Sequence, residues 1–291
     1  MGMKKVLVLL AVLVAVTWSF AAYTIGLSLS TLNNPFFVEL RNGAQSKAKE
    51  LGVNLIVVDA QDKPSKQIND IEDLIQKKVD LIIINPTDSS AIVPAIESAN
   101  KAKIPVITVD RGASGGTVVA HIASDNVLGG RMAADFIAQA LKGKGKVVML
   151  IGIPGTSAAR DRGAGFEAQL KKYPGIQLVA KQTANFNRAE GLKVMENLLQ
   201  AYPDIDAVFA QNDEMALGAI EAIKAAKKLG KIIVVGFDAI PDALEAVKKG
   251  EMAATVAQQP GLMGELAVEK AVDYLKTKTV YIPVDLKLVT K

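Results

Sequence analysis

Short runs of apolar residues alternate with amphipathic segments along most of this chain of 291 residues. The apolar runs are rich in Val and Ile and have the length of β-strands; they are residues 23–30, 53–60, 81–85, 104–110, 118–123, 145–152, 176–182, 206–212, 231–238 and 253–258. Uninterrupted apolar runs are typical of parallel strands buried on both faces, because a half-exposed strand alternates apolar and polar positions. Strands that alternate with helices predict an α/β fold, in which helices cover both faces of a parallel sheet.

The segment STLNNPFF begins the first predicted helix. Asn34 and Pro35 are typical of an N-cap and a first helical residue, and Gly52 is typical of a helix end. Phe36 and Phe37 are unusual at such a start, since a surface turn favours polar residues and adjacent phenylalanines indicate a core or a pocket. Asn34 therefore caps this helix, contacts a ligand, or does both through different atoms.

The pattern repeats itself along the chain. Pairs of similar positions in the two halves are separated by 127 or 128 residues; they are Asn85 and Asn212, Asp110 and Asp238, and Asn34 and Arg162. The sequence therefore predicts two similar α/β halves of ordinary domain size, with the joint near residues 124–126. A further predicted helix follows Gln258, after the last strand–helix repeat. This extra helix would allow the chain to return to the first half.

The first 21 residues have the three parts of a secretory signal. Lys4 and Lys5 supply the positive start, residues 6–16 are apolar, and small side chains at Ser19 and Ala21 suit a signal peptidase. A membrane anchor is the alternative, but the apolar run is too short to cross a bilayer core of about 30 Å. We expect cleavage after Ala21 and a periplasmic protein that is not lipid-anchored, because the chain has no Cys.

Composition argues against several functional classes. The formal net charge is +4, which includes the two signal lysines, and without a basic block nothing favours nucleic-acid binding. The absence of Cys excludes a thiol nucleophile and a thiolate metal site. His121 is the only histidine, and a hydrogen-bonded structural role is favoured for it, since a base needs a nucleophile or an orienting partner. We expect no enzymatic activity, no metal and no cofactor.

Phosphate binding also has little support. Neither G-x-x-x-x-G-K-[ST] nor G-x-G-x-x-G occurs in the chain. The loop GIPGTSAAR, residues 152–160, is explained first by helix capping through Thr156 or Ser157.

Polar and aromatic side chains gather where the predicted strands end, and ligands of open parallel sheets bind beyond the carboxyl ends of the strands. These side chains are amides, carboxylates, guanidinium groups and phenyl rings, with one serine; they are Ser30, Asn34, Phe36, Phe37, Asn85, Asp110, Arg111, Arg160, Arg162, Asn185, Phe186, Asn212, Phe237, Asp238 and Gln258. Only six of the 34 basic residues are Arg, and three of those six lie in these loops. Arginine offers a fixed fork of donors that a flexible lysine lacks, which indicates recognition rather than solubility.

This combination of side chains predicts a sugar ligand. Sugar hydroxyls donate and accept at once, so they match carboxylates, amides and guanidinium groups, while the C–H faces of the ring pack against phenyl rings. Each Asp or Asn alone has a plainer explanation as a cap or turn former, and Asp110 with Arg111 also suits a weak surface ion pair. The joint pattern in matched loops of both halves favours a ligand site.

Longer motifs carry a family resemblance. The segments STLNNPFF, NPTDS, IPVITVDR, HIASDNVLGG, GTSAARDRG, FAQNDEMALGA, VVGFD and PVDLKLV resemble those of the periplasmic ribose-binding proteins of bacterial ABC uptake systems, from about Tyr23 to the C-terminus. The resemblance implies a type I periplasmic binding fold, with two Rossmann-like domains of strand order 2-1-3-4-5 joined by a three-strand hinge. It implies the following division: residues 1–21 as signal peptide, 22–124 with 259–286 as the first domain, and 125–258 with 287–291 as the second. The chain would then leave the first domain again near Asp285.

The resemblance also implies a ligand site between the domains. Phe36, Phe37 and Phe186 would sandwich a ribose ring, with Phe237 nearby. The anomeric and ring oxygens would bond Asp110, Arg111 and Arg162. The remaining hydroxyls would bond amides and one carboxylate; these are Asn34, Asn85, Asn212, Asp238 and Gln258. Arg160 matches a family arginine without direct ligand contact, so we leave it out of the site.

Two departures from the family lie outside this site. Ala239 and Ile240 replace a Gly-Thr pair, and Pro154 stands where a small residue is usual. Either is able to change the stiffness of its loop, and neither changes the predicted class of ligand.

The predicted function is a monomeric receptor that delivers D-ribose to an ABC-transporter permease, and to a chemoreceptor as a second candidate partner. A receptor for allose, galactose or a furanose signal is the alternative within the same class. A transcription regulator of this fold needs a helix-turn-helix where the signal stands. A sugar-modifying enzyme needs a nucleophile–base pair or metal ligands that the chain lacks.

Overall fold

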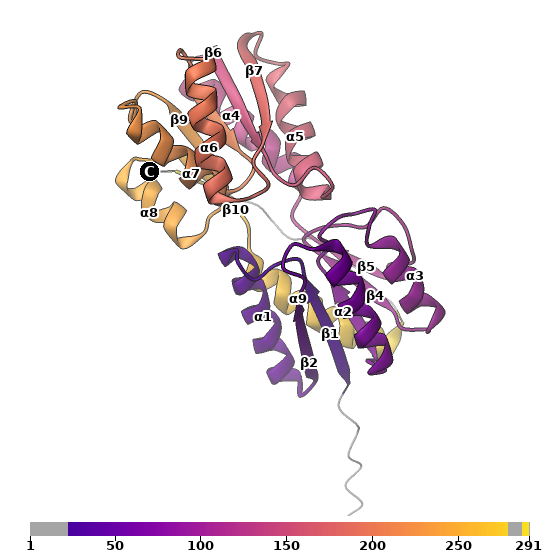
Figure 1. Ribbon diagram of the computed structural model, residues 1–291. Helices are drawn as coiled ribbons and strands as arrows, with labels where there is room; N and C mark the ends of the chain where they lie inside the picture. The colour runs from indigo at the N-terminus through magenta and orange to yellow at the C-terminus, as the bar shows by residue number, and fades with distance from the viewer. Residues whose placement is uncertain (1–22, 279–286, 291) are drawn as a thin grey trace, which may run out of the picture.

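The computed structural model describes residues 23–278 and 287–290, and it consists of two α/β lobes (Figure 1). The first lobe begins with alternating strands and helices: β1 (Thr24–Leu29), α1 (Pro35–Leu51), β2 (Asn54–Asp59), α2 (Pro64–Gln76), β3 (Leu81–Ile84), α3 (Val93–Lys101), β4 (Val106–Val109) and β5 (Ala120–Ile122). Its sheet is parallel with strand order β2-β1-β3-β4-β5.

The second lobe repeats this plan. Its elements are α4 (Asn126–Ala140), β6 (Lys144–Ile151), α5 (Ser157–Leu170), β7 (Gly175–Thr183), α6 (Arg188–Ala201), β8 (Ala207–Ala210), α7 (Asp213–Ala225), β9 (Ile233–Asp238), α8 (Pro241–Lys249) and β10 (Ala254–Ala257). The strand order is β7-β6-β8-β9-β10, with β11 (Lys287–Thr290) added antiparallel to β10. Both lobes thus have the predicted order 2-1-3-4-5, and the predicted fold class is confirmed.

The repeat seen in the sequence corresponds to equivalent positions in the two lobes. Asn85 and Asn212 follow β3 and β8, the third strand of each lobe, and Asp110 and Asp238 mark the ends of the fourth strands. The central strands β3, β4 and β8 are buried at every residue, as their unbroken apolar runs predict. The edge strand β7 is largely exposed in its second half, because no strand covers its outer side.

After β10 the chain returns to the first lobe through α9 (Pro260–Thr277), which packs along α1 (Figure 1). The two helices approach closely because small residues lie between them; a Cβ added at Gly264 would lie 2.0 Å from the carbonyl oxygen of Leu40. The chain therefore crosses between the lobes after β5 and after β10. The predicted third crossing, near Asp285, and the predicted signal peptide lie outside the described residues, and the domain boundaries stay predictions.

Local signals for helix ends are confirmed where the structure describes them. Asn34 is the N-cap of α1 and Gly52 ends it in a left-handed conformation, at φ 66°. Thr156 caps α5 through its side chain, so the GIPGTSAAR loop is a helix start.

His121 has the predicted hydrogen-bonded role, since its Nδ1 lies 2.9 Å from Thr108 Oγ1. Within residues 23–278 and 287–290, no helix has the length and apolarity that a membrane crossing needs.

Candidate ligand-binding site

The loops at the carboxyl ends of the strands enclose a cavity between the two lobes. It has about 250 Å³ of space, counting the part that opens to solvent. Residues from both lobes line it; they are Asn34, Phe36, Phe37, Asp110, Arg111, Ala158, Arg162, Phe186, Asn212, Asp238 and Gln258. Ten of the twelve residues predicted for the site therefore surround one cavity, and the other two, Asn85 and Phe237, lie directly behind it.

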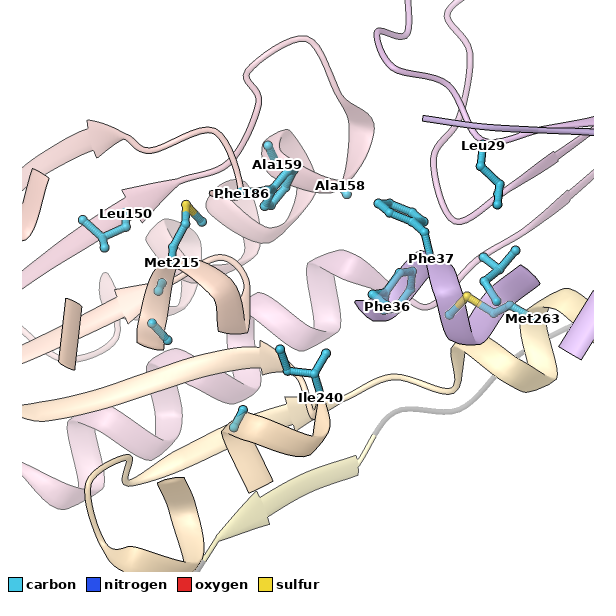
Figure 2. Packing of buried hydrophobic residues seen from close by; sticks show 14 of the residues in the cluster. Leu29, Phe36, Phe37, Leu150, Ala158, Ala159, Phe186, Met215, Ile240 and Met263 are labelled. Atoms are coloured by element: carbon cyan, nitrogen blue, oxygen red, sulfur yellow. The ribbon is translucent and has the colours of Figure 1, made fainter. Parts of the chain in front are cut away.

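Phenyl rings form the apolar part of the wall. Phe36 and Phe37, in the first turn of α1, meet edge to face with ring centroids 5.1 Å apart. Figure 2 shows them at the edge of the first lobe, with Phe186 and Ala158 on the facing lobe. Phe186 follows β7 with a left-handed backbone, at φ 57°, that turns its ring toward the cavity. The wall thus offers apolar faces from both lobes, as a sugar ring requires.

Asp110 and Arg111 supply charge from the first lobe, and both are only 3% exposed. Asp110 follows β4 with φ 61°, and its Oδ2 lies 3.7 Å from Arg111 Nε. The Arg111 guanidinium lies over two rings, 5.0 Å from the centroid of Phe37 and 5.3 Å from that of Phe186. Burial lowers the pKa of Arg111, and the negative charge of Asp110 opposes this shift. The pair is buried, so the alternative of a surface ion pair is wrong.

Asn85 lies behind Asp110 rather than in the cavity wall. Its Nδ2 donates to Asp110 Oδ2 at 3.1 Å and to the Val109 carbonyl at 3.1 Å, while its Oδ1 accepts from the Ser30 N–H. These three bonds use both amide hydrogens and one lone pair of the amide oxygen, because the strand ends of β1, β3 and β4 converge on Asn85. In this structure Asn85 therefore orients Asp110.

Arg162 supplies the second buried guanidinium. It lies on α5, where Nε donates to Asn126 Oδ1 at 2.9 Å and Nη1 donates to the Gln211 carbonyl at 2.7 Å. Its guanidinium lies 3.8 Å from the ring centroid of Phe237, so Phe237 supports Arg162 from behind the cavity. Burial lowers the pKa of Arg162, and the nearby Asp238 opposes this effect.

Asp238 and Gln258 complete the charged wall of the second lobe. Gln258 Nε2 donates to Asp238 Oδ1 at 2.7 Å, and Arg162 Nη1 lies 3.6 Å from the same oxygen. Burial raises the pKa of Asp238 to about 7, although the positive charge of Arg162 lowers it. The pKa of the Asp238 carboxyl is therefore close to neutral pH.

Asn34 and Asn212 both cap helices and both line the cavity. Asn34 Oδ1 accepts the Phe36 N–H at 2.9 Å, which confirms its capping role. Asn212 caps α7 through Met215 N–H, and its Nδ2 donates to the Phe186 carbonyl at 3.3 Å. Both residues line the cavity, so a second role in ligand binding remains a prediction.

Several buried polar atoms of the lining residues have no hydrogen-bond partner within the described part of the protein. Among the described residues, these atoms include Asp110 Oδ1, Arg111 Nε and Gln258 Oε1, which belong to three lining residues from both lobes. A buried polar group that stays unpaired costs about 1–3 kcal/mol, so this set favours a ligand that both donates and accepts hydrogen bonds. Hydroxyl groups meet that requirement.

Sequence reasoning missed Ala158 and Gln211. Ala158 lines the cavity from the first turn of α5, where a small apolar residue gives no chemical signal. Gln211 is buried; its carbonyl accepts from Arg162, and its side-chain oxygen accepts the Gly152 N–H. Its position before Asn212 at the end of β8 was the available signal.

Comparisons with known proteins agree with this geometry. The family model described as "Periplasmic binding protein domain" matches residues 25–279, and the chain belongs to that family. Among its relatives, the ribose import binding protein RbsB of Escherichia coli (strain K12) is 51% identical over 297 residues, covering all of both chains. The protein of the same name from Bacillus subtilis (strain 168) is 55% identical over 92% of this chain and 88% of its own length.

Solved structures extend the comparison to other ligands. A Caulobacter myo-inositol binding protein bound to myo-inositol is 38% identical, with a TM-score of 0.88 over 92% of this chain and 93% of the other. A carbohydrate transporter solute binding protein from Agrobacterium radiobacter in complex with D-arabinose is 34% identical, with a TM-score of 0.89 over 94% and 96%. The resemblance to ribose-binding proteins stated from the motifs is confirmed.

Proposed function

We propose that this protein is a periplasmic receptor that captures D-ribose between its lobes and delivers it to the permease of an ABC transporter. The observation that carries the proposal is the set of unpaired buried polar atoms on Asp110, Arg111 and Gln258, in a cavity that phenyl rings from both lobes also line. The ligand would pair with groups that are otherwise left unpaired, and the rings would cover its C–H faces.

We assign ribose rather than another sugar because the relatives named for ribose are the more similar in sequence. Proteins named for ribose are 51–55% identical to this chain, whereas a D-allose-binding periplasmic protein of Escherichia coli (strain K12) is 37% identical. A receptor for allose, galactose or a furanose is the second candidate, since a solved relative is described as a galactofuranose binding protein.

Ligand contacts from both lobes explain how binding would favour a closed form. Asp110 and Arg111 belong to the first lobe, while Arg162 and Asp238 belong to the second, so only closure brings all four to one ligand. We propose that the closed face then docks on the permease, through helices whose N-termini flank the cleft, and that a chemoreceptor uses the same closed form. The protein acts by binding alone, as an exported monomer whose signal peptide is removed.

Thermal unfolding across a sugar panel tests the proposal. Ribose, allose, galactose, arabinose, glucose and myo-inositol are added at matched concentrations, and ribose is expected to give the largest rise in melting temperature. A ligand at 100 times its dissociation constant adds about 2.7 kcal/mol. Asp110→Ala is the control variant, because it removes a lining carboxylate and is expected to abolish the ribose shift while the protein stays folded. A larger shift with glucose or galactose contradicts the ribose assignment.

Ligand-dependent transport tests the partner. Permease-containing vesicles are expected to take up ribose only with the sugar-bound receptor present. Equal docking of the sugar-free and sugar-bound forms contradicts closure-dependent delivery.

A further inference from the structure

Asp213 is a buried carboxylate outside the cavity. It is the first residue of α7 and has no exposed surface, yet it does not line the cavity. Its Oδ1 accepts the Thr255 hydroxyl at 2.7 Å, and its Oδ2 accepts the Ile240 N–H at 2.9 Å. A buried carboxylate is unfavourable unless it is hydrogen-bonded, so these two bonds account for how the fold tolerates it.

Both partners of Asp213 are connected to the turn that carries Asp238: Ile240 belongs to that turn, and Thr255 lies in the adjacent strand β10. Asp238 and Ala239 are consecutive residues with positive φ, at 123° and 60°. Non-glycine residues hold such conformations only where the surroundings impose them. Here the Ile240 N–H bonds to Asp213, and the Ala239 N–H donates to Thr255 Oγ1 at 3.2 Å. Both backbone amides after Asp238 are therefore held by Asp213, one directly and the other through Thr255.

The sheet is built to admit the Asp213 carboxylate. Gly236 lies in β9, two residues before Asp238, and a Cβ there would lie 2.2 Å from Asp213 Oδ1. Any larger residue would push the carboxylate away from the turn. Burial, and next the negative charge of Asp238, raise the pKa of Asp213 well above its usual range. The two carboxyl groups thus influence each other although only Asp238 faces the cavity.

We propose that Asp213 is a positioning residue for ligand binding, which holds the turn at residues 238–240 so that the Asp238 carboxylate faces the sugar. The inference rests on the sugar-binding function proposed above. Asp238 forms a bond with Gln258 and lies near Arg162, and both contacts require the strained turn to keep its direction. Asp213 does not line the cavity, so its effect on the ligand passes through this turn and through Asp238.

Asp213→Ala tests the inference, with Thr255→Val as a milder variant that removes only the hydroxyl link. Ribose affinity is measured by calorimetry, and hydrogen exchange of the segment 237–243 is measured by mass spectrometry without sugar. Asp213→Ala is expected to weaken ribose binding about tenfold or more and to speed exchange at Ala239 and Ile240. Thr255→Val is expected to change both in the same direction by a smaller factor, and it serves alone if Asp213→Ala does not fold.

Asp135→Ala is the matched control. Asp135 lies on α4 in the same lobe, and its Oδ1 accepts from Gln169 Nε2 and the Tyr173 hydroxyl, with no link to the cavity. It is expected to lower the melting temperature and leave ribose affinity unchanged. If Asp213→Ala also leaves affinity unchanged, or leaves exchange of 237–243 unchanged, the inference is overturned. A wild-type protein that binds no sugar overturns the proposed function instead, and the exchange result then decides the inference separately.

Discussion

At the scale of single residues, the cavity contains two buried acid–arginine pairs, one from each lobe. Arg111 and Asp110 lie 3.7 Å apart, and Arg162 and Asp238 lie 3.6 Å apart, so neither pair forms a short hydrogen bond of its own. Buried charges with such loose mutual contacts keep hydrogen-bonding capacity for a third group. Removing one member would leave its partner charged and buried, which is more damaging than removing both.

Proton release on ribose binding is the prediction at this scale. Asp238 has a pKa of about 7, and hydroxyls that donate to its carboxylate favour the ionised form and lower that pKa. Ribose binding is therefore expected to release protons near pH 7 and to strengthen as the pH rises from about 6 to 8. Calorimetry in phosphate and Tris buffers measures the release, since the apparent binding enthalpy then depends on the buffer.

The raised pKa of Asp238 also makes the stability of the fold depend on pH. Because burial raises the Asp238 pKa above its ordinary value of 3.8, its contribution to stability is fully present below pH 3.8. It is lost as the pH rises through about 7. The charges around Asp238 are Arg162, Asp110, Arg111 and the neighbouring Asp213. Asp238→Asn is expected to remove the buffer dependence, and equal binding enthalpies in both buffers for the wild type contradict the prediction.

At the scale of elements, the turn between β9 and α8 is strained where the family pattern has glycine. Ala239 has φ 60°, and a left-handed conformation costs a non-glycine residue about 1–2 kcal/mol. Glycine removes that strain but is more flexible in the unfolded chain, which offsets about 0.5–1 kcal/mol. Ala239→Gly is therefore expected to raise the free energy of unfolding by up to about 1 kcal/mol and the melting temperature by about 1–3 °C.

The control is a second alanine-to-glycine substitution, at an alanine with ordinary helical geometry, and the melting temperatures of both variants are measured by calorimetry. Ala164 is exposed on α5, and Ala164→Gly is expected to lower stability by up to about 1 kcal/mol. If both substitutions lower the melting temperature equally, Ala239 is not strained.

The elements were predictable from sequence because their signals are local. The apolar runs of β3 and β4 and the cap at Asn34 depend on a few neighbouring residues, and all are confirmed. Asn85 and Phe237 support Asp110 and Arg162, which lie between them and the cavity. This arrangement depends on packing between elements that are distant in sequence. Asn85 was predicted to bond a ligand hydroxyl, which stays a prediction, while its hydrogen bond to Asp110 could be seen only in the structure.

At the scale of the whole molecule, the two lobes touch outside the cavity. The Ser89 N–H donates to the Gly155 carbonyl at 2.9 Å, and the Gly112 N–H donates to Ser157 Oγ at 2.8 Å. Ser89 and Gly112 belong to the first lobe, while Gly155 lies in the loop before α5 of the second lobe and Ser157 is the first residue of that helix. These contacts depend on the lobes being close together, so they add to the stability of the closed form without touching a ligand.

Ser157→Ala is the prediction that follows for closure. The substitution leaves the Gly112 N–H without its acceptor only when the lobes are closed, so it shifts the equilibrium toward the open form. One hydrogen bond contributes about 0.5–1.5 kcal/mol, which predicts ribose binding weaker by about 2- to 12-fold, mainly through faster dissociation in stopped-flow measurements. Ser65→Ala, exposed on α2, is the control and is expected to bind as the wild type does. Unchanged affinity and dissociation in Ser157→Ala would mean that this contact is equally present, or equally absent, in the sugar-free and sugar-bound forms.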